Sequence, residues 1–200
     1  MATLNVTAGD IFLVPTQKDG TLGYLTGRVL SYNKAATVEI FDHFSHELTV
    51  NRQVLCQQVF RKEDRLFPPI MAVFLFDRIS GKKKWPLLGA SASFDKNERN
   101  HGAVFLTPVY HETGLYVEDG ESKQDSENQR SRIAEASTIW QNQQIIFRTR
   151  FYMDGLMKKG EIFDYSGIAG QLLAEGRLNR LMAEAIAISD EVSSKIKIIG

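Results

Sequence analysis

Short apolar stretches bounded by glycine, proline and asparagine dominate the first part of the chain and predict β-strands. The segment Asp10–Val14 follows a Gly-Asp turn and ends at Pro15, while Leu22–Tyr32 is a longer stretch that contains two glycines. Apolar and polar residues alternate through Ala36–Phe41, as they do in a strand with one buried face. Because short turns separate these strands, we expect a meander, which bulges at the glycines would curve.

Further strand patterns follow along the chain. Ile70–Phe76 is a continuous apolar run, which is typical of a buried central strand. Ala103–Tyr110 and Ile145–Met153 also have strand character. In Ile145–Met153, successive side chains would point to opposite faces of the strand. His46–Phe60 fits both helical and strand spacing, so both interpretations stay open.

The last part of the chain has a different pattern. Ser166–Ile188 is rich in alanine, leucine, methionine and glutamate, and its apolar residues recur near the helical period. Ser166 suits a helix N-cap, and Gly176 divides the stretch into two helices. The sequence therefore predicts an α+β fold: a curved, mostly antiparallel sheet, either a meander or a half-barrel, with C-terminal helices packed on it.

Length and composition favour one domain. The chain has 200 residues, of which 43% are hydrophobic, and this is enough for a single core. We expect a β-rich part over about residues 1–155 and a helical part over about 156–200. Acidic and polar residues fill Glu118–Arg132, so we expect a mobile acidic loop at about 118–131 that leads into a short helix at Arg132–Trp140.

Composition also restricts location and partners. The chain has one cysteine, so no internal disulfide forms, which fits a reducing compartment. The start of the chain lacks a signal-peptide pattern, and no run approaches 18 apolar residues. We therefore expect a cytoplasmic protein with no membrane contact. Lysine plus arginine equals aspartate plus glutamate, at 24 each, which argues against nucleic acid as a partner.

No catalytic motif stands out, and we expect no metal and no cofactor. The chain has no nucleophile elbow, phosphate-binding loop, dinucleotide fingerprint or zinc-protease motif. If the protein is an enzyme, the candidate catalytic residues are His43, His46, His101 and His111. General acid–base chemistry would require these side chains to converge in a cleft. Nothing around Cys56 marks a reactive thiolate.

Several motifs together carry a resemblance to a known family. They are Gly9-Asp10-Ile11-Phe12 with Pro15, Gly27-Arg28-Val29-Leu30, Glu39-Ile40-Phe41-Asp42 and Trp85-Pro86-Leu87-Leu88-Gly89. In their order and spacing they resemble the immunity protein 26 family of bacterial polymorphic-toxin systems. The likeness covers roughly the first half of the chain, to about Pro108. It implies a cytoplasmic β-rich protein that binds and blocks a cognate toxin.

Two groups of residues are candidates for such binding. The acidic residues Glu118, Asp119, Glu121 and Asp125 would complement a basic toxin. Arg148 and Arg150 would form a basic face on the strand that the sequence predicts there.

Two other hypotheses are open. One is a small hydrolase, since the family is grouped by name with a phosphotriesterase of the HocA type. The other is a self-associating interaction module, in which the C-terminal helices form the seam of a homodimer.

The same motifs also have structural interpretations. Gly9-Asp10 sets a tight turn, Trp85 fills the core, and Gly27-Arg28-Val29 forms a bulge whose arginine pairs with Asp42 or Glu39. Alternatively, Asp10, Arg28 and Asp42 form a buried polar cluster, in which an unpaired charge would be costly.

Overall fold

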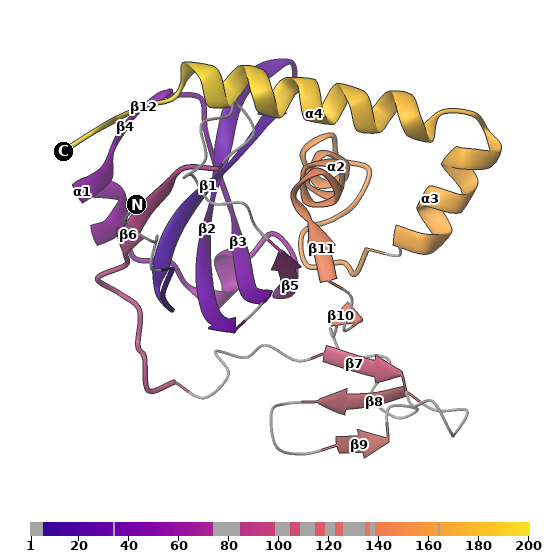
Figure 1. Ribbon diagram of the computed structural model, residues 1–200, viewed down its shortest axis with the longest axis horizontal. Coiled ribbons are helices and arrows are strands. Elements are labelled where there is room, and N and C mark those ends of the chain that lie inside the picture. Colours follow the sequence, from indigo (N-terminus) through magenta and orange to yellow (C-terminus); the bar gives the residue numbers. More distant parts are fainter. Residues whose placement is uncertain are drawn as a thin grey trace.

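A six-stranded open sheet forms the centre of the molecule in the computed structural model (Figure 1). The structure describes residues 6–33, 35–73, 85–98, 105–108, 115–118, 123–125, 135–136, 139–163 and 165–200. The sheet has the strand order β11-β5-β3-β2-β1-β6. Its strands are β1 (Asp10–Lys18), β2 (Thr21–Asn33), β3 (Ala35–Ser45), β5 (Ile70–Val73), β6 (Leu87–Ala90) and β11 (Ile139–Gln141). Neighbouring strands are antiparallel except β11 and β5, which are parallel.

Two smaller sheets and five helical segments complete the described part of the chain. One sheet has the order β10-β7-β8-β9, with strands β7 (Phe105–Pro108), β8 (Leu115–Glu118), β9 (Lys123–Asp125) and β10 (Glu135–Ala136). The other is the parallel pair of β4 (Thr49–Asn51) and β12 (Lys197–Ile199). The helices are α1 (Arg52–Gln57), a 3-10 turn at Lys62–Asp64, α2 (Asn142–Met153), α3 (Tyr165–Ala174) and α4 (Leu178–Lys195).

The predicted meander is confirmed by β1, β2 and β3. A two-residue turn at Asp19-Gly20 joins β1 to β2, and both residues have positive φ, at 49° and 76°. Such a turn matches the right-handed twist of a hairpin. The pairing of β2 with β3 shifts register between Leu25 and Gly27 and again between Val29 and Ser31. These irregularities are the expected bulges in the glycine-containing strand.

Residue 27 must be a glycine, because its neighbour across the β1–β2 pair leaves no room for a side chain. Gly27 lies opposite Phe12, and a Cβ atom at this position would lie 2.3 Å from Cζ of the Phe12 ring. The ring therefore occupies the space that a side chain at residue 27 would fill. Phe12 also stacks on Trp85, with ring centroids 6.0 Å apart, so Trp85 has the predicted place in the core.

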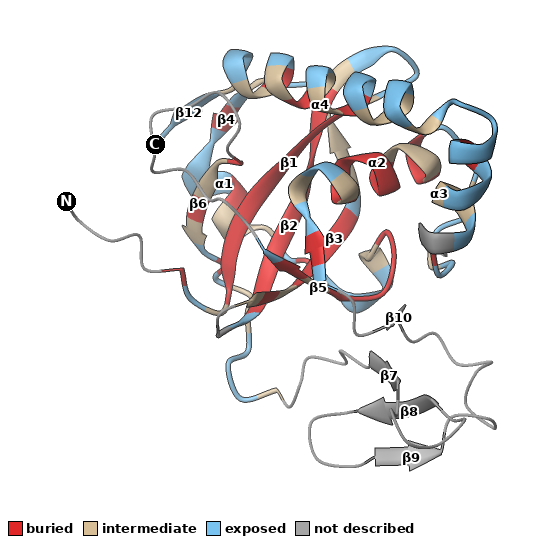
Figure 2. Ribbon diagram, turned by 45° about the vertical axis from the view of Figure 1, so that its right-hand side comes forward, coloured by how far each residue is buried: buried red, intermediate tan, exposed pale blue. Residues whose placement is uncertain are grey.

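Both faces of the central sheet are buried, as Figure 2 shows by the red colour of β1 and β2. Phe12 and Val14 point into a core covered by α2 and α4. Ile11 and Leu13 point into a second core, to which the α1 segment contributes Leu55. Burial on both sides explains why the first strand is apolar at successive positions rather than at alternate ones.

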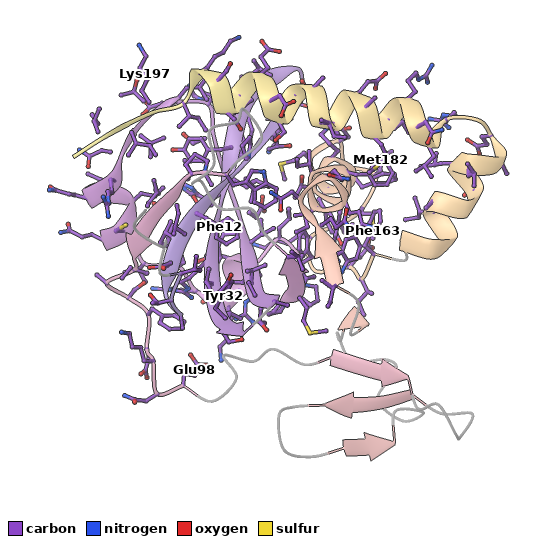
Figure 3. The ribbon with its side chains drawn as sticks, viewed as in Figure 1. Phe12, Tyr32, Glu98, Phe163, Met182 and Lys197 are labelled. Carbon is purple, nitrogen blue, oxygen red and sulfur yellow. The ribbon has the colours of Figure 1, made fainter. Side chains whose placement is uncertain are left out.

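The C-terminal helices pack on the sheet as expected. Gly176 has a φ of 66° and lies between α3 and α4, where the sequence predicts a break. α4 contacts β1 and α2, and its residues Ala185, Ser189 and Val192 are buried. Met182 lies on the side of α4 that faces α2 (Figure 3). The apolar stripe of α4 is thus used inside the chain, so a dimer seam would need other residues.

Three local predictions need correction or completion. Ile145–Met153 is not a strand, because these residues form the helix α2. Its alternating pattern is ambiguous because residues 145–149 are all buried, which removes the polar face that identifies a surface helix. The described residues of Arg132–Trp140 lie in β10 and β11 rather than in a short helix. His46–Phe60 contains both a strand, β4, and a helix, α1.

The described parts of the acidic segment include strands. Glu118 ends β8 and Asp125 ends β9, and these two strands pair antiparallel. None of the described helices has the length and apolar character needed to cross a membrane.

Candidate functional site

The candidate catalytic histidines are not brought together in the part of the chain that the structure describes. His43 lies in β3, where its Nε2 atom is 3.2 Å from Nε2 of Gln58 and its ring meets the ring of Phe60 edge-on. His46 follows β3 and is exposed. His101 and His111 lie outside the described residues. The described residues include no group of three histidine, cysteine or acidic side chains placed to hold a metal.

The buried polar cluster has different members from those predicted. Arg28 Nε donates to Glu39 Oε1 at 2.6 Å, and Arg65 Nε donates to Glu39 Oε2 at 2.6 Å. Asp42 is exposed, with its carboxylate 3.9 Å from Lys159 Nζ, so the prediction that it joins the cluster is wrong.

Asp10 is buried, and its carboxylate accepts a hydrogen bond from the Thr7 backbone, as the predicted turn requires. Of the two partners predicted for Arg28, Glu39 forms the ion pair and Asp42 does not. No sequence pattern points to Arg65, because it lies in an irregular segment 26 positions after Glu39.

The Arg28–Glu39–Arg65 cluster is a structural feature rather than a binding site. The Glu39 side chain is fully buried, and the Arg28 guanidinium lies 5.3 Å from the ring centroids of both Phe41 and Phe94. A carboxylate enclosed in this way cannot reach an external ligand, and it stabilises the attachment of the 58–66 segment to the sheet.

Arg148 and Arg150 lie in different environments. Arg148 is fully buried, and its guanidinium lies 3.9 Å from the centroid of the Phe67 ring and 4.9 Å from that of Trp140. The predicted basic strand face therefore does not exist. Arg150 is partly exposed and lines a groove on the helical side of the molecule.

Among the acidic candidates, Glu118 and Asp125 have the strand positions given above, while Asp119 and Glu121 lie outside the described residues.

The groove lies between α2, α3 and α4 and has a volume of about 490 Å³. Each helix lines it with a pair of apolar residues four positions apart, namely Phe147 and Phe151, Ile168 and Leu172, and Leu181 and Ala185. Residues four apart lie on one helix face, one above the other. Three helices thus present three apolar ridges to a single concave floor.

Charged side chains surround this floor. Arg150 forms an ion pair with Asp154, at 2.9 Å, where α2 ends. Arg177 forms another with Glu175, at 2.8 Å, in the connection between α3 and α4. Glu184 of α4 completes the charged lining. The groove therefore combines an apolar floor with a charged rim, which is the anatomy of a protein–protein interface.

The lining has little capacity for catalysis. It contains no histidine, cysteine, serine or lysine. Hydrogen bonds from Arg177 and Gln171 lower the pKa of the Glu175 carboxyl, so this group is a fixed negative charge at neutral pH rather than a proton donor. The arrangement is suited to binding, in which charges and apolar surface are matched by a partner.

Cys56 lies apart from the groove, next to β6. Its Sγ atom is 3.7 Å from the backbone oxygen of Gly89. Burial raises the pKa of the Cys56 thiol, and the nearby Arg52 opposes this effect only in part. Cys56 is therefore a protonated thiol at neutral pH, as its sequence surroundings predict.

The groove was not predicted from the sequence, although the four-residue spacing of its apolar pairs is visible there. Phe147 and Phe151 are four apart, but the alternating pattern of Ile145–Met153 favours a strand over a helix. The comparisons with known proteins add no assignment: no protein-family model, no curated protein and no solved structure matches this chain.

Proposed function

We propose that this chain is an immunity-type binding protein that neutralises a cognate bacterial toxin by direct contact. The observation that carries the proposal is the helix-lined groove, which offers apolar floor residues and paired charges and whose lining has no histidine, cysteine, serine or lysine. An inhibitor needs a complementary surface and no chemistry of its own, and this is what the groove provides.

The scaffold supports the same proposal. The motifs that resemble the immunity protein 26 family fall on β1, β2, β3 and β6, which are adjacent strands of the central sheet. Both faces of that sheet are covered, so its strands supply rigidity, and recognition is left to the elements around it. A rigid scaffold reduces the conformational entropy that is lost when a partner binds.

Co-expression with the protein encoded immediately upstream tests the proposal. We expect that protein to stop growth when it is produced alone, and we expect this chain to restore growth and to co-elute with it in gel filtration. A matched control produces the same upstream protein with an unrelated protein of similar size. If the upstream protein is harmless alone, or is toxic but neither bound nor blocked, the proposal is wrong.

A further inference from the structure

We infer that β12 pairs with β12 of a second copy of this chain, so that two copies are joined in one four-stranded sheet. β12 is an outer strand of the two-stranded sheet that it forms with β4. In the described part of the chain, no strand pairs with the other edge of β12. The inference goes beyond the proposed function, because it concerns association of the chain with itself.

All three residues of β12 are exposed, which distinguishes it from other short outer strands. β6 and β11, at the two edges of the central sheet, each contain a buried residue, as does β4. In β12, Ile198 is 45% exposed and Ile199 is 50% exposed, and successive side chains of a strand point to opposite faces. β12 thus exposes apolar surface on both faces. An exposed edge of this kind is a template for another strand.

The backbone of Ile198 is directed away from β4. The N–H of Lys197 donates to the carbonyl oxygen of Leu48, at 2.8 Å, so the backbone groups of Lys197 face β4. The hydrogen-bonding groups of neighbouring residues in a strand point in opposite directions. Ile198 therefore presents its N–H and its C=O to the free edge, and these two groups select an extended backbone as the partner.

An edge residue that presents both a donor and an acceptor is self-complementary about a two-fold axis. When the axis passes between the two Ile198 residues, each Ile198 N–H donates to the Ile198 C=O of the other copy. This is the hydrogen-bonded pair of an antiparallel ladder. Most homo-oligomers are two-fold dimers that use the same surface patch on both copies, and the edge of β12 supplies such a patch.

The same register gives compatible side-chain pairs. The two Ile198 side chains lie opposite each other, and Lys197 lies opposite Ile199 of the second copy. The two lysines are therefore not opposed, and like charges directly opposite would destabilise a sheet. Packing between β-branched side chains across the strands stabilises it.

Association would also extend a sheet that is small within one chain. β4 and β12 have three residues each and are parallel. Isolated two-stranded pairs are marginally stable in water, and parallel pairing is slightly weaker per residue than antiparallel pairing. Two copies joined through β12 give the strand order β4-β12-β12-β4. Because the shared edge is short, we expect a weak dimer, with a Kd of roughly 0.1 mM.

The edge of β12 lies away from the helix-lined groove. Figure 1 shows β12 beyond one end of α4 and α3 beyond the other end. No residue of β12 lines the groove. A dimer formed through β12 therefore leaves the groove of each copy open, so self-association is compatible with binding of another protein there.

Sedimentation equilibrium of the full chain, from about 0.01 to about 1 mM, measures this association. Ile198→Pro removes the outward N–H, and proline is tolerated on an edge strand where the missing N–H would face solvent. The pairing with β4 should therefore remain, while each dimer loses two hydrogen bonds and association weakens about tenfold or more. Ile198→Val keeps the N–H and a β-branched side chain, so this matched control should change association less than about threefold.

Oxidative crosslinking tests the register in chains whose native thiol is removed by Cys56→Ser. Ile198→Cys places two thiols opposite each other, with Cα atoms about 5.5 Å apart, which a disulfide can span. Ile199→Cys is the matched control. Its two thiols lie on a diagonal of the ladder, with Cα atoms about 7–8 Å apart, which is beyond the usual span of a disulfide.

We expect a dimer that Ile198→Pro weakens, and a disulfide between copies that forms readily only with Ile198→Cys. A chain that stays monomeric at about 1 mM would overturn the inference. A dimer that a folded Ile198→Pro variant retains at full strength would overturn it too. If circular dichroism shows that Ile198→Pro does not fold, the crosslinking decides: equal or faster crosslinking of Ile199→Cys contradicts the pairing of β12 with itself.

Discussion

The carboxylate of Glu39 is held by Arg65, which lies 26 positions later in the chain and donates to Oε2 at 2.6 Å. The other carboxylate oxygen accepts from Arg28 at 2.6 Å. Glu39 is fully buried, and the side chains of the two arginines are only 8% and 11% exposed. This cluster joins the irregular segment after α1 to the central sheet.

Loss of the Glu39 charge should destabilise the fold strongly. Glu39→Gln removes the carboxylate with which two largely buried guanidinium groups pair, and removal of one partner from a buried ion pair typically costs about 3–5 kcal/mol. Urea unfolding followed by circular dichroism gives the free energy of unfolding. Glu63→Gln is the control, because Glu63 is 69% exposed and 3.9 Å from Arg61, and it should change stability by about 1 kcal/mol or less. Similar losses in the two variants would contradict this assignment.

A side chain at residue 27 should disrupt the pairing of β1 with β2. Gly27→Ala places a Cβ atom 2.3 Å from the Phe12 ring, and overpacking of a core typically costs about 1–3 kcal/mol. Phe12→Leu in the same chain should recover part of this loss, since the smaller side chain vacates the space. A double-mutant cycle measured by urea unfolding gives the coupling, and additive losses would contradict the contact.

Gly170→Ala is the control for that experiment. Gly170 lies inside α3 and is exposed, with no atom within 4 Å of a Cβ built there. Alanine should therefore stabilise the helix by about 0.5–1 kcal/mol.

Cys56 should become reactive only at a higher pH than an ordinary thiol. Burial raises the pKa of Cys56, and the thiolate is the reactive form, so its alkylation by iodoacetamide should be slow at neutral pH. The pH at which the alkylation rate reaches half of its maximum should be higher for the folded chain than for the same chain in urea. A midpoint at or below the value in urea would contradict the burial of the thiol.

Arg52→Gln refines this measurement. The positive charge of Arg52 lowers the pKa of Cys56 and so opposes the effect of burial. Its removal should move the midpoint still higher, whereas a shift to lower pH would show that the two groups do not interact as the structure indicates.

α4 should act as part of the core rather than as a free dimer seam. Val192 is fully buried in α4, and Val192→Asp places a charge against the apolar core, at a cost of about 3 kcal/mol or more. Ala187→Asp, on the exposed side of the same helix, should leave the thermal midpoint nearly unchanged. A wild-type dimer that Val192→Asp converts into a stable folded monomer would contradict this role.

The strands of the sheet could be predicted where local chemistry determines the structure. The Asp19-Gly20 turn, the glycines of β2 and the apolar run of β1 each favour one conformation over short distances. The break between α3 and α4 was predictable for the same reason, because Gly176 adopts a positive φ that other residues disfavour.

The rest depends on contacts between distant residues. Most residues of α2 are buried, including all of residues 145–149, so this stretch lacks the polar face that distinguishes a surface helix from a strand. The partner of Glu39 and the groove between three helices both arise from tertiary packing, which no local pattern encodes. The candidate site therefore emerged from the structure, whereas the hypothesis of toxin binding came from motifs in the sheet.

Titration of the purified toxin with this chain tests the central claim of neutralisation by binding most directly. The remaining toxin activity should fall linearly as the chain is added and should reach its minimum near one equivalent, with no dependence on incubation time. Inactivation that proceeds over time with far less than one equivalent would instead show that the chain acts as a catalyst, and full activity at excess chain would show that it does not neutralise this toxin. Either result would contradict the account.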